Sequence, residues 1–158
     1  MATRHVSTPT SSSGNGLLSR LFGNGEKGFS TSSNLISYLG SLQTNVFFAD
    51  SGFNIVYANN KAIETLKDIE DEVKKAFRVS IDDIVGGSIH RFHKDSRRIE
   101  KILQDPRSLP HEAEFEFGNV TLKTSINAAY DAKGATLGYV VNWENVTEIK
   151  KIEAKMAQ

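Results

Sequence analysis

The stretch that decides the fold reads AEFEF at 113–117, VTLKTSI at 120–126 and LGYVVNW at 137–143. Apolar and polar residues alternate in the first two parts, which is typical of strands with one buried face and one face in water. The sequence DAKG at 131–134 supplies a hairpin turn before the last part. We therefore expect three consecutive antiparallel strands. The residues expected on one face of the last strand are Leu137, Tyr139, Val141 and Trp143.

Two more strands are predicted earlier in the chain. The segments NVFFAD (45–50) and FNIVYAN (53–59) flank Asp50-Ser51-Gly52, whose residue types are common in tight turns. Between these strands and the last three, the periodicity indicates several short helices within residues 60–104. One is opened by Asn60, one covers 69–77, and one ends near Gln104. Helices packed on one face of a five-stranded antiparallel sheet make an α+β domain.

The N-terminal region is predicted in two parts. Residues 1–33 are rich in Ser, Thr, Gly and Asn, a composition that favours a disordered tail. The apolar island Leu17–Phe22 within it could dock on a partner or a membrane surface, but it is too short for a stable isolated helix. A cap helix is expected from Leu35 to about Gln43, after Ser33-Asn34 as its N-cap. Its apolar face would carry Leu35, Ile36, Leu39 and Leu42.

The C-terminal residues Glu148–Met156 are predicted to be helical. Ile149, Ile152 and Met156 recur at spacings of three and four, as at the start of a coiled-coil seam. The expected division of the chain is therefore a tail over 1–33, one domain over 34–147 and the start of a C-terminal helix over 148–158. The length of 158 residues suits one domain with tails.

Composition excludes several classes of function. Nineteen Lys and Arg balance nineteen Asp and Glu, so the chain has no overall charge to attract nucleic acid. The absence of cysteine excludes disulfides, thiolate catalysis and Cys-based zinc sites. There is no apolar run of about 18 residues and no signal peptide, so a cytoplasmic protein is expected. No arrangement of catalytic residues is indicated, and we expect no enzyme activity.

The order of these elements resembles a PAS domain over roughly residues 40–150. Val46–Asp50 followed by Ile55–Asn59 resembles its first hairpin. The sequence Trp143-Glu144-Asn145-Val146-Thr147-Glu148 resembles the motif that joins the last PAS strand to a signalling helix. That motif commonly has Asp where this chain has Asn145, which puts coupling through a salt bridge there in doubt. The resemblance implies the PAS fold and a homodimer formed through the cap helix and the C-terminal helix.

A narrower resemblance concerns the two histidines of IHRFHKD (89–95), followed by LPH (109–111) and the strand that ends in Trp143. These phrases are similar to the PAS domains of bacterial chemoreceptors, a group that includes soluble aerotaxis-type oxygen sensors with b-type haem. The resemblance implies that His93 ligates iron, that Trp143 hydrogen-bonds bound oxygen and that Leu122 lines the distal side. His90 is the second candidate for the iron ligand. The implied role is cytoplasmic signal transduction in chemotaxis, with haem b as cofactor and a downstream signalling partner.

Each of these residues also has a purely structural explanation. His93 could cap the next helix, and Trp143 could be a core aromatic that donates to a backbone acceptor. Gly86-Gly87 is explained by a tight entry into the following helix. Lys94, Arg97 and Arg98 could pair with haem propionates but are expected to be solvated, and His111, at the edge of a strand, is given no role.

The alternative function is that of a haem-free PAS domain for dimerisation and scaffolding. In that case the interior would be filled by side chains such as Phe92, Phe115, Phe117 and Trp143. A third possibility is a small organic ligand in the same pocket. The haem sensor requires an interior pocket large enough for a porphyrin, whereas the scaffold predicts a pocket filled by side chains.

Overall fold

The structure is a computed structural model, and it describes residues 31–158. The predicted tail over 1–33, except for its last three residues, and the island Leu17–Phe22 lie outside the described residues. Contacts divide the chain into two units, one that ends at Tyr38 and one that runs from Leu39 to Gln158. The predicted domain therefore corresponds most closely to the second unit.

The first described element is helix α3 (Ser32–Gly40). It begins three residues before Leu35 because the amide of Asn34 donates to Thr31 Oγ1 at 3.3 Å, which satisfies one free amide of the first turn. It ends at Gly40 rather than near Gln43, consistent with the low helix propensity of glycine. The predicted cap helix is therefore present with shifted bounds.

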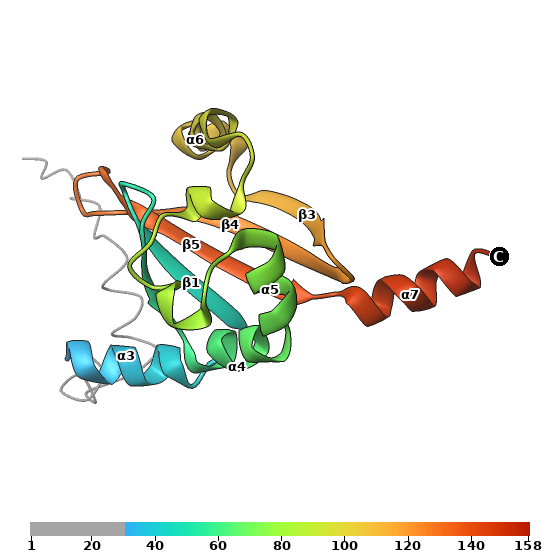
Figure 1. The fold of residues 1–158 in the computed structure, drawn as a ribbon. Helices are drawn as coiled ribbons and strands as arrows, with labels where there is room; N and C mark the ends of the chain where they lie inside the picture. The colour runs from blue at the N-terminus through green and yellow to red at the C-terminus, as the bar shows by residue number, and fades with distance from the viewer. Residues whose placement is uncertain (1–30) are drawn as a thin grey trace, which may run out of the picture. The chain divides into compact units, whose positions relative to one another are not determined.

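The second unit is built on one five-stranded antiparallel sheet with the order β2-β1-β5-β4-β3 (Figure 1). The three C-terminal strands are neighbours in chain order, which confirms the predicted meander. Strand β1 then pairs with β5 on one side and with β2 on the other. The strands are β1 (Asn45–Asp50), β2 (Ile55–Ala58), β3 (His111–Phe117), β4 (Val120–Tyr130) and β5 (Thr136–Asn145).

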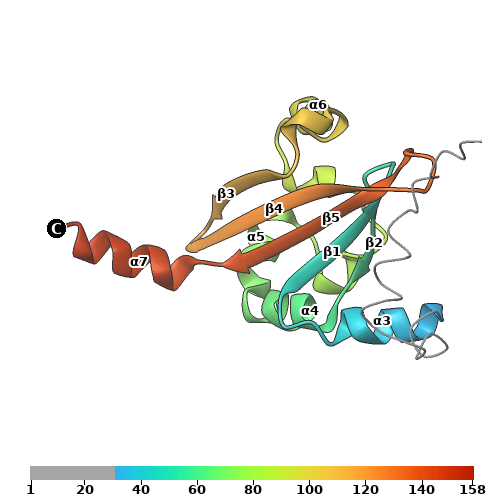
Figure 2. The ribbon, with the colours of Figure 1, turned by 180° about the vertical axis from the view of Figure 1, so that it is seen from behind.

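Short helices connect β2 to β3 and cover one face of the sheet. Figure 2, seen from behind, shows the strands in front of these helices. The predicted helices at Asn60, at 69–77 and up to Gln104 are all present. The helical segments are α4 (Asn60–Asp68), α5 (Glu70–Phe77), the 3₁₀ turns η1 (Ile81–Asp83) and η2 (Ile89–Phe92), α6 (Ser96–Gln104) and η3 (Pro106–Ser108).

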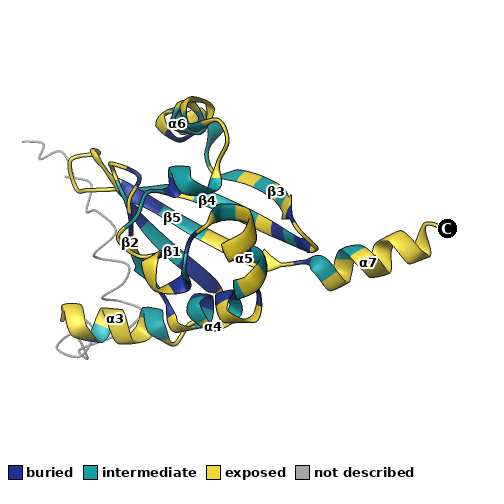
Figure 3. Ribbon diagram, viewed as in Figure 1, coloured by how far each residue is buried: buried dark blue, intermediate teal, exposed yellow. Residues whose placement is uncertain are grey.

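The hydrophobic core lies between the covered face of the sheet and these helices (Figure 3). Ile55, Val73 and Ile84 are among its most deeply buried side chains. Two strand predictions need correction. Leu137 is 60% exposed, because the register with β4 shifts between Thr136 and Gly138 at the start of β5. Phe53 has a φ of 67° and belongs to the turn, so β2 begins only at Ile55.

The buried side chain of Asn59 ties the start of α4 to β1. It is 1% exposed, and its Oδ1 accepts from the amides of Ala62 (3.0 Å) and Val46 (3.1 Å). Its Nδ2 donates to the carbonyl of Thr44 at 2.8 Å. One carboxamide thus caps a helix and satisfies backbone groups of the neighbouring strand, which fixes α4 against the sheet.

The C-terminal helix α7 (Thr147–Met156) follows β5 directly. Asn145 Oδ1 accepts from the Thr147 amide at 3.1 Å, and Thr147 Oγ1 accepts from the amide of Thr121 in β4 at 3.0 Å. Neutral hydrogen bonds of Asn145 and Thr147 therefore stand where an aspartate at position 145 could form a salt bridge. An ion pair of 3.0 Å also joins Lys150 to Glu114 of β3. None of the described helices is long and apolar enough to cross a membrane.

Candidate functional site

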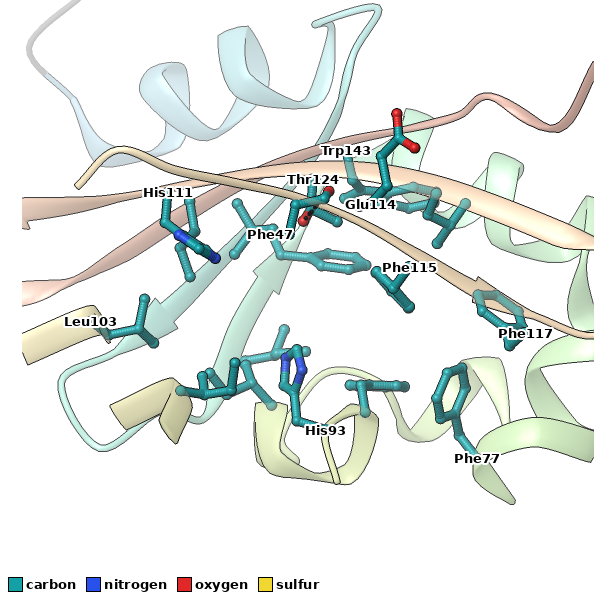
Figure 4. Close-up of a pocket in the computed structure, with 18 of the residues that line it drawn as sticks. Phe47, Phe77, His93, Leu103, His111, Glu114, Phe115, Phe117, Thr124 and Trp143 are labelled. Atoms are coloured by element: carbon teal, nitrogen blue, oxygen red, sulfur yellow. Dashed lines mark hydrogen bonds between the residues drawn. The ribbon is translucent and has the colours of Figure 1, made fainter. Parts of the chain in front are cut away.

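A cavity of about 360 Å³ lies between the sheet and the short helices (Figure 4). This volume falls within the roughly 300–1,000 Å³ of typical small-molecule sites. The sheet contributes a wall of strand side chains, and η2 and α6 contribute the opposite wall. The apolar side chains that line it include Phe47, Phe77, Phe92, Ile99, Leu103, Phe115, Phe117, Leu122, Ile126 and Val141.

The loop before η2 is held by the guanidinium of Arg91. It donates to three backbone carbonyls, those of Ser88 (2.9 Å), Asp83 (2.8 Å) and Ile84 (2.8 Å). A Cβ atom at Gly87 would collide with this guanidinium, so glycine is required for Arg91 to lie across the loop. Arg91 and three backbone hydrogen bonds that join residues 86–89 to Phe53 and Ile55 therefore set the position of η2, and with it the residue that follows.

His93 is that residue, and its imidazole enters the cavity from the helical side (Figure 4). The residue is exposed because it faces the open space of the cavity. Surrounding protein atoms nevertheless lower the pKa of His93, first by desolvation and second by the charge of nearby His90. A lowered pKa keeps the imidazole neutral, and the neutral form is the one that binds metals.

Trp143 lies in the opposite wall, on β5, and is only 4% exposed. Its ring packs against Phe47, with centroids 5.5 Å apart. The indole Nε1 is buried and has no hydrogen-bond partner among the residues that the structure describes. A core tryptophan that donates to a backbone acceptor is therefore not what this chain contains. Leaving such a donor unpaired costs about 1–3 kcal/mol, which a ligand in the cavity could recover if the ring turned to bring Nε1 to the cavity surface.

His90, the second candidate for the iron ligand, does not line the cavity. Its Nε2 lies 2.8 Å from Glu100 Oε1, its Nδ1 is buried, and its ring packs on Phe53 at 5.5 Å. Their spacing of three would place both histidines on nearly the same face if residues 88–93 formed one helical turn. They do not, because His93 follows the end of η2 in an extended conformation, with φ −127° and ψ 135°.

Three other residues of the sequence analysis also line the cavity. Leu122 of β4 is buried in the sheet wall. His111, at the start of the edge strand β3, points into the cavity (Figure 4), although the sequence gave no reason to assign it a role. Arg98 reaches the cavity from α6, whereas Lys94 and Arg97 do not line it. Arg98 is exposed as well, so the expectation of a solvated side chain is compatible with its place at the cavity.

Comparison with solved structures shows which fold this arrangement belongs to. The Aer2 receptor of Vibrio cholerae, described as a dual PAS-haem oxygen sensor, matches with a TM-score of 0.61 and 26% identity over 69% of this chain and 98% of that one. A PAS domain from Colwellia psychrerythraea matches with a TM-score of 0.50 and 12% identity over 73% of this chain and 97% of that one. The chain has the PAS fold. The predicted resemblance and the predicted fold class are confirmed.

The PAS fold also occurs in neighbours with other ligands. An RNA-binding Light-Oxygen-Voltage receptor matches with a TM-score of 0.52 and 11% identity over 98% of this chain and 40% of that one. No family model and no curated protein matches the chain. The PAS fold by itself therefore does not identify the ligand, which must be argued from the cavity.

Within this PAS domain, the described residues contain no group of three or more His, Cys, Asp or Glu side chains that could hold a metal ion. A site for a bare metal ion among them is therefore not supported. Haem needs less from the protein, because the porphyrin supplies four ligands and one axial side chain suffices. His93, in a cavity lined mainly by apolar side chains, satisfies that smaller requirement.

Proposed function

We propose that this PAS domain is a sensor that binds b-type haem in the cavity, with His93 as the axial ligand, and responds to oxygen or another diatomic gas. The observation that carries the proposal is the buried, unpaired Nε1 of Trp143 in the wall of the cavity into which His93 projects. An iron ligand on one wall and an unpaired hydrogen-bond donor in the other suit gas binding at haem, once a turn of the indole brings its N–H to the cavity surface.

Several side chains of the cavity would each contribute to haem and gas binding. When haem is bound, its iron is the atom that takes up the gas. His93 offers a neutral imidazole, and Trp143 offers an N–H that can donate to a gas molecule carrying partial negative charge. Leu122 keeps the gas side apolar. Arg98 and His111 are the basic side chains available for the two carboxylates of the porphyrin.

The similarity to the Aer2 receptor of Vibrio cholerae supports this proposal, since that protein is described as a PAS-haem oxygen sensor. The open cavity supports it independently. A haem-free scaffold would fill its interior with Phe92, Phe115, Phe117 and Trp143, but these side chains line a space of about 360 Å³. The cavity favours a ligand-binding domain over a scaffold.

The output would follow from the position of Trp143 on β5. Asn145 and Thr147 join the end of this strand to α7 and β4 by hydrogen bonds. A shift of Trp143 on gas binding would therefore reach α7. The exposed side chains Ile149, Ile152 and Met156 of this helix are the expected contact surface of a homodimer. The dimer would pass the signal on to a downstream partner. A ligand shifts this element only as far as it binds the two states differently.

The test is the visible spectrum of the full chain expressed with haem precursors, recorded after reduction and after exposure to oxygen or carbon monoxide. We expect a Soret band that shifts with gas, that is lost in His93→Ala and that persists in His90→Ala, the matched control outside the cavity. A colourless protein that takes up no added haemin would contradict the proposal. Binding of an organic compound unaffected by His93→Ala would instead support the small-ligand alternative.

A further inference from the structure

The carboxamide of Asn45 is buried directly beside the backbone of Trp143. Asn45 is the first residue of β1, is 7% exposed and pairs with Trp143 across the sheet. Its Nδ2 donates to the carbonyl of Trp143 at 3.0 Å. Because a carbonyl only accepts, this contact also fixes the orientation of the amide, so that Oδ1 faces the other way.

Oδ1 of Asn45 faces helix α4. It lies 2.8 Å from the hydroxyl of Thr65, which also lies 3.0 Å from the carbonyl of Lys61. A hydroxyl has one proton to donate, so Thr65 can serve the carboxamide or its own helix, and the contact with Asn45 is the shorter one. One buried side chain therefore bridges the strand that carries Trp143 and the helix that covers this end of the sheet.

The same strand also confines the indole. Phe47 lies two residues after Asn45 and therefore on the same face of β1, where its ring packs against that of Trp143. Asn45 holds the backbone of Trp143, and Phe47 limits the movement of its ring. An unpaired indole N–H persists in an apolar wall only where the surrounding structure prevents the ring from turning away towards water or an acceptor.

We propose that Asn45 is a positioning residue for Trp143, which it holds in the cavity wall by tying the Trp143 carbonyl to Thr65 of α4. The consequence for gas binding rests on the proposed function, but the placement of the indole does not. Substitution of Asn45 removes the tie between the Trp143 carbonyl and α4, and the indole then moves from its buried position although Trp143 stays paired with Thr124 of β4.

Trp143 is the only tryptophan of the chain, so its fluorescence reports this one position. We expect Asn45→Ala to shift the emission of the haem-free full chain to longer wavelength and to raise its quenching by acrylamide. Thr65→Val, which keeps the shape of the side chain and removes the hydroxyl, should cause a smaller change in the same direction. Thr65→Ser should restore the emission of the original chain, because it keeps the hydroxyl.

The matched control is Asn142→Ala. Asn142 is exposed and precedes Trp143 in β5, so its side chain points to the opposite face of the sheet. In the haem-loaded protein, loss of one or two buried hydrogen bonds should raise the oxygen dissociation rate roughly 2- to 10-fold in Asn45→Ala. Asn142→Ala should leave both the fluorescence and this rate unchanged.

The outcomes separate the two proposals. A folded Asn45→Ala protein with the emission, quenching and oxygen release of Asn142→Ala would overturn the role of Asn45. If Asn45→Ala does not fold, equal fluorescence of Thr65→Val and Thr65→Ser would overturn it. If the chain takes up no haem but the fluorescence responds as expected, the proposed gas sensing fails while the positioning of Trp143 by Asn45 is supported.

Discussion

The two walls of the cavity are built in different ways. The wall that carries Trp143 consists of strands whose antiparallel register is continuous around this residue, so backbone hydrogen bonds determine where each side chain there points. The wall that carries His93 consists of a loop, a 3₁₀ turn and a short helix, which are held by side chains that bond to the backbone and by three backbone bonds to Phe53 and Ile55. The first wall is specified by local alternation, and the second depends on a few individual contacts.

The largest effect is expected from breaking the helical wall at Arg91. Its guanidinium holds three carbonyls, which no strand or long helix satisfies in its place. Arg91→Ala should lower the free energy of unfolding by about 2–4 kcal/mol, because charged hydrogen bonds to backbone groups are lost together. Urea denaturation of the haem-free chain measures this.

Two further variants sharpen that measurement. Arg91→Lys should recover only part of the loss, since an ammonium cannot reproduce the planar fork of a guanidinium. Arg97→Ala, on the exposed side of α6, should change the free energy of unfolding by less than about 0.5 kcal/mol. Equal effects of Arg91→Ala and Arg97→Ala would show that Arg91 does not hold the helical wall.

At Trp143, in the sheet wall, the N–H should determine gas binding, and the buried ring should contribute to stability. Trp143→Phe keeps a large aromatic ring against Phe47 and removes the N–H, and Trp143→Leu removes both. If the indole donates to the gas, both variants should lower oxygen affinity and raise the autoxidation rate of the haem-loaded protein. A hydrogen bond of about 1–2 kcal/mol corresponds to roughly 5- to 30-fold.

Oxygen titration and the rate of spectral change in air measure these two quantities. Unchanged affinity and autoxidation in Trp143→Leu would remove Trp143 from the gas site. A normal Trp143→Phe protein beside an altered Trp143→Leu protein would mean that the bulk of the ring matters and its donor does not.

The same contrast explains what the sequence could predict. Strict alternation in 113–117 and 120–126 and the turn at 131–134 predicted β3, β4, their hairpin partner β5 and the face of Trp143, because strand periodicity is local. The predicted face is interrupted at Leu137, where the register with β4 shifts at the start of β5, and no local alternation signals such a shift.

For the helical wall, the sequence named some of the residues but did not predict how they are arranged. The spacing of His90 and His93 suggested one shared face, but the backbone becomes extended after η2 and separates them. That His111 and Arg98 line the cavity follows from how β3 and α6 pack, which no local pattern contains. The bridge from Asn45 to Trp143 joins residues 98 positions apart, and isolated asparagines give no signal for it.

The smallest expected effect concerns the response of the two walls to pH. The helical wall holds His93, whose pKa is lowered in the folded chain, mainly by desolvation. Between that lowered value and about 6.5, the unfolded chain binds a proton that the folded chain does not. The free energy of unfolding of the haem-free chain should therefore fall as the pH decreases through this window and stop falling below the folded pKa.

His93→Gln should flatten this part of the pH profile, by less than the effect of one full proton because the imidazole faces the open cavity. Urea denaturation between pH 5 and pH 8 measures it, with those limits chosen to bracket roughly the ordinary histidine range. Trp143→Phe changes the sheet wall without changing any titrating group, so the free energy of unfolding should keep its original slope against pH. A steeper fall in stability on acidification in His93→Gln would show that protonation of His93 stabilises the fold, and that the helical wall favours the charged imidazole.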